Sequence, residues 1–379
     1  MLKAIRSHFL VIIQYVLFCW VLSSPGVRLY AQEVTISQVT GSVSGGASVV
    51  LAGQSFGDKP SGSPFKWDDF QGGQPGSIVS TAGVNPWSVY SAVPGVSVTP
   101  QYAPAYAALP LSGGSGLLAR FAGDISARQY FAQQAEGYVS NVSLYLNNAP
   151  STLYMSGWAN YAMSPDSTMR NLKIFQHNRG EWTSPTTRWD LYPVTSSGHV
   201  TSERCSPSEY VLNQWGAQLP ARYGWHRIEA WHDRNASGEL LKVWIDGAQV
   251  YNAQASFSAG CSQTSWYIMS YADRQTSLGT EFLDWHWSEL YIDNTLARVE
   301  IGNAATFSGS SHREIQIPIS WTSNSITFTV NLGTFTPGQT VWLYVVNSAG
   351  AVNANGYPVV VAGGDSNSPG APTQLRVTD

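Results

Sequence analysis

The chain has 379 residues and a formal net charge of −4, and charged residues make up only 12% of it. A mildly acidic sequence without a basic run has no electrostatic footprint for nucleic acid, so we expect no nucleic-acid partner. Aromatic residues are as frequent as charged ones, with 15 Trp and 19 Tyr, and there are 35 Gly. This composition is typical of an extracellular β-sandwich with many turns.

Residues 1–31 have the pattern of a secretory signal peptide. Lys3 and Arg6 precede the apolar run Phe9–Leu22, and the small residue Ala31 stands before Gln32. This order predicts cleavage after Ala31, export to the periplasm, the cell surface or the medium, and no membrane insertion afterwards. The alternative is a transmembrane anchor, but a helical span needs roughly 20 apolar residues and this run is shorter. Cleavage removes three basic residues and no acidic one, so the formal charge becomes −7.

Alternation of apolar and polar residues dominates the rest of the chain and predicts strands throughout. Residues 32–60 contain two short strand patterns, at 34–39 and 47–52. Residues 61–296 form an aromatic-rich body, with further patterns at 142–146, 153–161, 172–177, 225–231 and 242–251. In the last of these, Asp246-Gly247 is a two-residue hairpin signal. The nearest candidate for a helix is the short stretch 208–215.

Residues 297–362 again contain strand patterns, but without the Trp clustering of the body. These patterns lie at 315–319, 326–330, 341–346 and 357–361. Residues 363–379 are rich in Gly, Ser, Asn and Pro, which is typical of a linker or tail. Neither 32–60 nor 297–362 alone has enough strands for a two-layer core, whereas together they supply six or seven. We therefore predict one split domain that is interrupted by residues 61–296.

Three motifs in the two flanks resemble the IPT/TIG family of immunoglobulin-like domains. Val49–Gly57 is similar to the family's first hairpin, which ends in a G-x-x-F-G turn. Trp321–Val330 resembles its W-S-D-T-S-I-T-V-T-V strand, and residues 341–350 with 355–358 resemble its closing hairpin. The resemblance implies that the split domain is an immunoglobulin-like β-sandwich.

The body resembles the concanavalin A-like jelly rolls of laminin G modules, lectins and polysaccharide lyases. Trp225–Trp231 followed by Val243–Gly247 is similar to their W-H-x-x-E and v-W-x-D-G hairpin. Leu283–Asp293 resembles their closing strand, although the second Asp of that pattern is absent around Trp285–Trp287. The predicted fold class is therefore all-β: a jelly-roll β-sandwich inserted into a split immunoglobulin-like β-sandwich, after a signal peptide.

Aromatic and polar residues that interleave on single strands predict a glycan-binding groove. Aromatic rings stack on sugars, while Arg pairs well with a carboxylate. The candidate residues are Trp158, Lys173, His177, Trp225, Arg227, Glu229 and Trp231. Alternation places Lys173 and His177 on one face of their strand, and Arg227, Glu229 and Trp231 on one face of theirs. The alternative is that the aromatics are core and rim residues, with Arg227 and Glu229 a surface pair.

A lyase would need a base and a group that neutralises the substrate carboxylate. His177, Tyr154, Lys173 and Arg227 are the candidates for these roles. The R-x-E-x-R, Q-x-H and Y-x-K-x-G strands of the alginate-lyase branch are missing, as is the E-x-D-x-E strand of laminarinase-type hydrolases. No candidate catalytic residue is therefore part of a known catalytic motif, and an enzyme is our second hypothesis after a non-catalytic protein.

Two further residue sets have a structural interpretation. First and last strands of a jelly roll are usually neighbours, so Asp68, Asp69, Asp284 and Asp293 would hold a structural Ca²⁺. The alternative is that these carboxylates lie in water. Cys205 and Cys261 remain after signal cleavage and would pair in an oxidising compartment, or else be buried thiols. No phosphate loop or dinucleotide motif is present, so we expect no cofactor apart from this Ca²⁺.

Three functional hypotheses follow from the sequence. The first is a secreted or cell-surface, non-catalytic protein that binds a polysaccharide or cell-surface glycan and serves in adhesion. The second is a polysaccharide lyase that acts on a uronate-containing polymer. The third is a structural surface or appendage protein.

Overall fold

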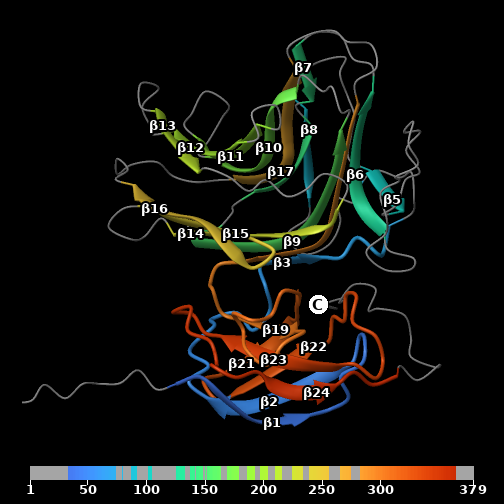
Figure 1. Cartoon of the computed structure of the whole chain (residues 1–379), viewed down its shortest axis with the longest axis vertical. Helices are drawn as coiled ribbons and strands as arrows, with labels where there is room; N and C mark the ends of the chain where they lie inside the picture. Colours follow the sequence, from blue (N-terminus) through green and yellow to red (C-terminus); the bar gives the residue numbers. More distant parts are fainter. Residues whose placement is uncertain are drawn as a thin grey trace, which may run out of the picture. The chain divides into compact units, whose positions relative to one another are not determined.

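The computed structural model describes residues 33–73, 79, 87–91, 101–104, 125–132, 137–140, 142–147, 150, 152–163, 169–178, 186–192, 197–203, 210–215, 224–233, 239–255, 265–274 and 282–363. These residues form strands, turns and bends, and none of them is helical (Figure 1). Within this part of the chain, no helix is long and apolar enough for a membrane span. The predicted signal peptide 1–31 and both Cys205 and Cys261 lie outside the described residues, so cleavage and the disulfide stay predictions.

The two flanks of the sequence together build one β-sandwich of two four-stranded sheets. The first sheet has the order β1 (Thr35–Thr40), β2 (Ser48–Gln54), β22 (Ser325–Thr329), β21 (Ile317–Trp321). The second has the order β20 (Arg313–Ile315), β19 (Arg298–Gly302), β23 (Thr340–Val346), β24 (Tyr357–Val360). We call this structure the split sandwich. It exists because β2 pairs antiparallel with β22, although the two strands lie far apart in the sequence.

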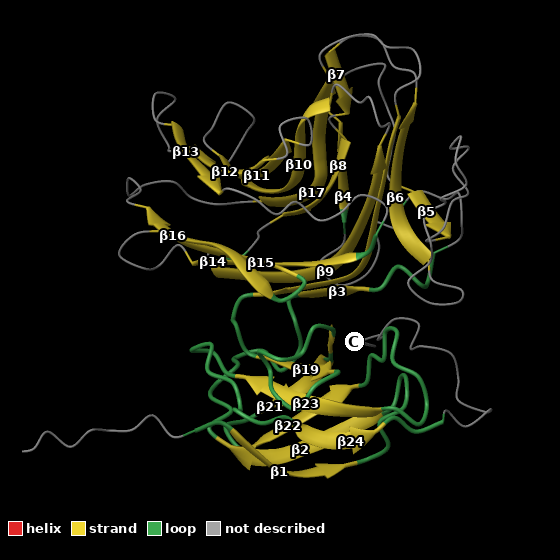
Figure 2. Cartoon of the chain, viewed as in Figure 1, coloured by secondary structure: helices red, strands yellow, loops and turns green. Residues whose placement is uncertain are grey.

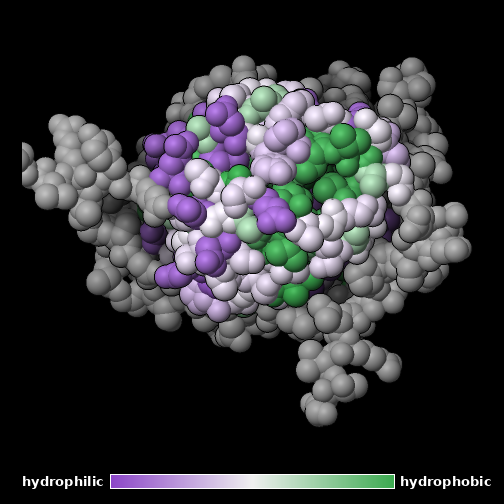
Figure 3. All heavy atoms as spheres, turned by 90° about the horizontal axis from the view of Figure 1, so that it is seen from below, coloured by the Kyte–Doolittle hydropathy of each residue, from purple (hydrophilic) through white to green (hydrophobic). Residues whose placement is uncertain are grey.

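The core of the split sandwich is shared by both flanks. Val49 and Leu51 of β2 are fully buried and belong to one cluster with Ile326 and Phe328 of β22. The alternate residues of β2 are exposed or half-buried, as expected for a strand that covers a core on one face only. The outer surface mixes hydrophilic and hydrophobic areas (Figure 3).

All strands between the flanks pair among themselves in two further antiparallel sheets (Figure 2). The sheet that we call the inner sheet has the order β16 (Ala248–Ala255), β15 (Glu239–Ile245), β14 (His226–Asp233), β9 (Thr152–Met163), β18 (Phe282–Asp293), β6 (Ile125–Ala132), β5 (Gln101–Pro104), with β3 (Lys66–Asp68) on β18. The sheet that we call the distal sheet has the order β13 (Tyr210–Trp215), β12 (Ser197–Glu203), β11 (Thr186–Tyr192), β10 (Met169–Asn178), β17 (Ser265–Arg274), β8 (Val142–Asn147), β4 (Ser88–Ser91), with β7 (Gly137–Ser140) on β17.

These sheets confirm the predicted fold class of one sandwich inserted into another. The predicted boundaries near residues 60 and 296 stay predictions. The hairpin at β15 and β16 is confirmed in detail: Asp246 has φ +50° and Gly247 has φ +78°, as a type I′ turn requires. The helix considered for 208–215 is wrong, because Tyr210–Trp215 is the edge strand β13 and pairs with β12 in regular register.

Candidate functional site

The predicted groove residues on β14 lie against the split sandwich. Arg227, Glu229 and Trp231 share one face of β14, as alternation predicted, and they are only 3%, 2% and 7% exposed. Arg227 donates from Nη1 to Oε2 of Glu300 at 2.7 Å and to the main-chain oxygen of Arg313 at 3.0 Å. A glycan would reach this face only by displacing the split sandwich.

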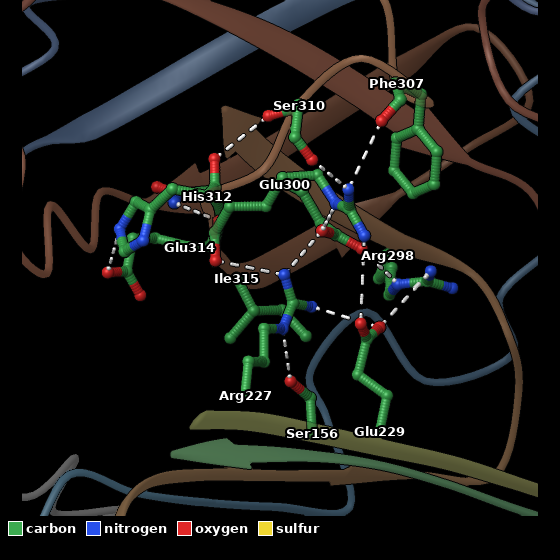
Figure 4. Close-up of polar contacts among 12 residues, drawn as sticks. Ser156, Arg227, Glu229, Arg298, Glu300, Phe307, Ser310, His312, Glu314 and Ile315 are labelled. Atoms are coloured by element: carbon green, nitrogen blue, oxygen red, sulfur yellow. Dashed lines mark hydrogen bonds and ion pairs between the residues drawn. The ribbon is translucent and has the colours of Figure 1, made fainter. Parts of the chain in front are cut away.

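Glu300 is the centre of a buried ion-pair cluster (Figure 4). Its carboxylate is 0% exposed and accepts hydrogen bonds from Arg227, from Nε of Arg298 at 2.6 Å and from Nε of Arg313 at 2.9 Å. Burial raises the pKa of Glu300, but the three guanidinium charges outweigh burial and hold it well below its usual value. The cluster is completed by Glu229, whose Oε1 accepts from Nη2 of Arg227 at 3.2 Å. We call these five residues the arginine–glutamate cluster.

Tyr154, a candidate for the base of a lyase, is part of the same contact. Its hydroxyl donates to Oε1 of Glu229 at 2.6 Å, and the guanidinium of Arg298 lies 4.4 Å from its ring centroid. The side chain is fully buried, in a cluster with Trp231 and with Ile315 of the split sandwich. Burial raises the pKa of the Tyr154 hydroxyl, so this phenol is held protonated. An ionised Tyr154 is therefore strongly disfavoured in this arrangement.

The two remaining Trp candidates on the inner sheet differ in their surroundings. Trp158 is 8% exposed and donates from Nε1 to Oε2 of Glu314 at 3.0 Å, with its ring centroid 5.2 Å from that of His312. Trp225 is half-buried just before β14, and its ring centroid lies 6.4 Å from that of His286 in an edge-on arrangement.

The other two candidates, Lys173 and His177, lie on β10 of the distal sheet, where they do not share a face. Lys173 is opposite Asp190, whereas Phe175 is opposite the adjacent residue Trp189. A β-bulge between Lys173 and Phe175 therefore reverses the alternation, and the pairing with β17 has an irregularity at the same place. The expectation of one shared face is corrected by this bulge, which puts His177 and Lys173 on opposite faces.

Ile268 and Leu146 identify which face of the distal sheet lies on the core, because they are 0% and 1% exposed. On β10, Phe175 is directly opposite Ile268 of β17, and His177 is opposite Trp266 of β17. On its other side, Trp266 is opposite Leu146 of β8. His177 is thus at a core-face position. The core-face positions in register with these are more often apolar than polar: Val89, Leu144, Trp189, Val200 and Val211 against Thr187, Ser202 and Asn213.

The opposite, outer face of the distal sheet has a different composition. One lateral row contains charged and amide residues with one Tyr: Gln214, His199, Asp190, Lys173 and Tyr271. The next row contains Leu212, Thr201, Arg188, Gln176, Tyr267, Tyr145 and Ser88. In Figure 2 the long strands β10 and β17 of the distal sheet curve. We call these two rows the outer-face rows.

The outer-face rows carry the residue types that recognise an acidic sugar. Tyr rings stack on sugar faces, Lys and Arg pair with carboxylates, and Gln and Asp bind hydroxyl groups. Of these positions, only Lys173 is among the residues predicted from the sequence. The alternation in 186–192 and 197–203 was a signal for the rest, but it does not tell which face a core covers.

The carboxylates considered for Ca²⁺ have other partners where they are described. Asp68 accepts from Nε1 of Trp87 at 2.7 Å, Asp69 accepts from the main chain of Gln71 at 3.1 Å, and Asp293 pairs with Lys59. The side chain of Asp284 lies outside the described residues. Among the described side chains, no group of three or more potential ligands is placed to hold a metal ion. The calcium site stays a prediction.

Comparisons with known proteins identify no relative by sequence: no protein-family model and no curated protein matches the chain. Among solved structures, the alginate lyase Aly36B is similar with a TM-score of 0.36 and 11% identity, over 46% of this chain and 82% of that one. An endo-1,3-beta-glucanase from Streptomyces sioyaensis has a TM-score of 0.38 and 13% identity, over 62% and 98%. The receptor binding domain of botulinum neurotoxin type G has a TM-score of 0.33 and 10% identity, over 71% of each chain. At these values the similarities carry no argument about function.

Proposed function

We propose that this chain is a secreted or cell-surface, non-catalytic protein that binds an acidic polysaccharide or cell-surface glycan and serves in adhesion. The observation that carries the proposal is the composition of the outer-face rows of the distal sheet. There Lys173, Arg188 and His199 share a face with Tyr145 and Tyr267, while the core face of the same strands is mainly apolar.

The chemistry of these rows favours a uronate-containing ligand. Arg188 is in the row next to Lys173, so two cations stand on neighbouring strands of one face. Carboxylates along a polymer are recognised best by such pairs, and the rings of Tyr145 and Tyr267 would supply the stacking surface. The split sandwich, which we infer to be IPT/TIG-like, would then be the platform that presents the distal sheet.

The proposal is tested by screening the exported protein on a glycan array, with and without Ca²⁺. We expect selective binding to acidic glycans, and a loss of at least tenfold in affinity for Arg188→Ala and Tyr267→Ala. Lys242→Ala is the matched control, because this substitution also removes one positive charge, but from β15 of the inner sheet. Absence of glycan binding, together with concentration-dependent assembly, would instead support a structural surface protein.

A second candidate function is a polysaccharide lyase on a uronate polymer. The observation in its favour is the row in which Lys173, Asp190 and His199 are consecutive neighbours across three strands. A base such as His199 and a cation such as Lys173 are what abstraction of a proton next to a carboxylate needs. Unsaturated products absorb in the ultraviolet, so their formation, and its loss in His199→Ala, would replace the non-catalytic proposal with this one.

A further inference from the structure

Lys59 and Asp293 meet at the point where the chain leaves the split sandwich and returns to it. Lys59 lies between β2 and β3, and Asp293 is the last residue of β18. Nζ of Lys59 donates to Oδ2 of Asp293, and the two side chains are 0% and 1% exposed. A Lys and an Asp are thus held against each other with water excluded from both.

The carboxyl group of Asp293 is also held by two other donors. The hydroxyl of Tyr291 donates to Oδ2 at 2.7 Å, and the main-chain N–H of Asn294 donates to Oδ1 at 2.7 Å. Tyr291 is itself 0% exposed. Donors fixed on both oxygens would stabilise negative charge that develops on the carboxyl group when a nucleophile attacks its carbon.

The buried site also favours the uncharged forms of the pair. Burial lowers the pKa of the Lys59 ammonium and raises the pKa of the Asp293 carboxyl, while their mutual attraction partly opposes both shifts. A neutral amine is a nucleophile, and a protonated carboxyl loses its hydroxyl as water far more easily than a carboxylate does.

We propose that Lys59 and Asp293 form an intramolecular isopeptide bond. Nζ of the neutral amine attacks Cγ of the protonated carboxyl, and Asn294 N–H stabilises the charge on Oδ1. The C–N bond forms, the bond from Cγ to Oδ2 breaks, and Oδ2 leaves as water with a proton that the amine gives up. Tyr291, hydrogen-bonded to Oδ2, is a positioning residue that assists this departure. No oxidant or reductant is involved, because an amine and an acid give an amide and one water.

A second buried Lys nearby provides an internal contrast. Lys66 is 7% exposed, but its Nζ lies 3.7 Å from Oδ2 of Asp68, whose side chain is 20% exposed. The carboxyl of Asp68 has donors of the same kind as Asp293, since Oδ2 accepts from Nε1 of Trp87 and Oδ1 from the main chain of Phe70. The two pairs therefore differ in the separation of Lys and Asp and in the exposure of the Asp. Only the Lys59 pair joins the outgoing and returning segments, and its bond would close a loop between residues 234 positions apart.

The proposal is independent of glycan binding and is tested on the exported full chain. Mass spectra of the unfolded, reduced protein first identify its N-terminal residue. The measured intact mass is then expected to be lower by one water than the mass calculated for the sequence from that residue onward. After trypsin digestion, the peptides that contain Lys59 and Asp293 are expected as one branched species. An unaltered mass with two separate peptides would overturn the proposal.

Variants then assign the roles. Lys59→Arg is expected to restore the full mass, whereas Lys66→Arg, the matched control, is expected to keep the loss of water. Tyr291→Phe is expected to slow the loss of water after synthesis, followed as the cross-linked fraction in intact-mass spectra of newly made protein over time. Loss of water that persists in Lys59→Arg would place the reaction elsewhere and overturn the proposal. An unchanged rate in Tyr291→Phe would remove Tyr291 from it.

Discussion

At the scale of single residues, Glu300 is the position where one substitution should matter most. Glu300→Gln keeps the size of the side chain but leaves Arg227, Arg298 and Arg313 buried with one carboxylate fewer. Breaking a buried ion pair on one side typically costs about 3–5 kcal/mol, because an uncompensated charge stays buried. We expect that loss in the free energy of unfolding by denaturant. Glu33→Gln, at an exposed position, should change it by less than about 0.5 kcal/mol.

Asp69 gives a prediction about pH. Burial raises the pKa of its carboxyl, so ionising Asp69 costs the folded state stability. That penalty is absent below the unfolded-state pKa of about 4 and grows as pH rises through the folded-state pKa. Asp69→Asn should therefore stabilise the protein at pH 7 and have little effect at pH 3, as measured by unfolding midpoints. A gain of equal size at both pH values would contradict the titration argument.

The shared face of Arg227, Glu229 and Trp231 was predictable from the sequence, whereas its burial was not. Alternation correctly put Arg227, Glu229 and Trp231 on one face of a strand, because the side-chain period of a strand is two residues. It gave no information on what covers that face, since the partners Glu300 and Arg313 of Arg227 follow 73 and 86 residues later. An Arg and a Glu on one face suit a glycan and a buried ion-pair cluster equally well.

At the scale of the element, the β15–β16 hairpin connects the inserted sandwich to the arginine–glutamate cluster. A Cβ at Gly247, where φ is +78°, would lie 2.8 Å from Nη2 of Arg313. Gly247→Ala should therefore lower the free energy of unfolding by roughly 1–2 kcal/mol, because a residue other than Gly takes a left-handed conformation, and by a further amount because Arg313 is displaced. Gly338→Ala, with φ +86° and nothing within 4 Å, carries only the first cost. If thermal or denaturant unfolding shows the same loss of stability in both variants, Arg313 moves aside without cost.

Elements also differ in how far the sequence predicts them. Strands β8, β9, β14 and the hairpin turn follow from local patterns, and they were predicted close to their observed bounds. The bulge in β10 was not, because both its neighbours, β11 and β17, help to set it through their registers. That single shift decides whether Lys173 or His177 is on the outer face, so the candidate site was predictable only in part.

At the scale of the whole molecule, the split sandwich should fold without its insert. Its core joins Val49 and Leu51 to Ile326 and Phe328, and the ends of the insert meet at Lys59 and Asp293. A short Gly/Ser linker in place of residues 59–293 would span that gap at little entropic cost.

We expect such a shortened chain to unfold cooperatively in denaturant, at lower stability, because its Arg298–Glu300–Arg313 side would lose Arg227 and Glu229. Residues 294–363 alone are the matched comparison. They lack β1 and β2, which leaves β22 an open edge over an exposed core, and they should not fold. If both chains remain unfolded, the insert is an obligatory part of the core. The arginine–glutamate cluster would then be the interface through which it acts.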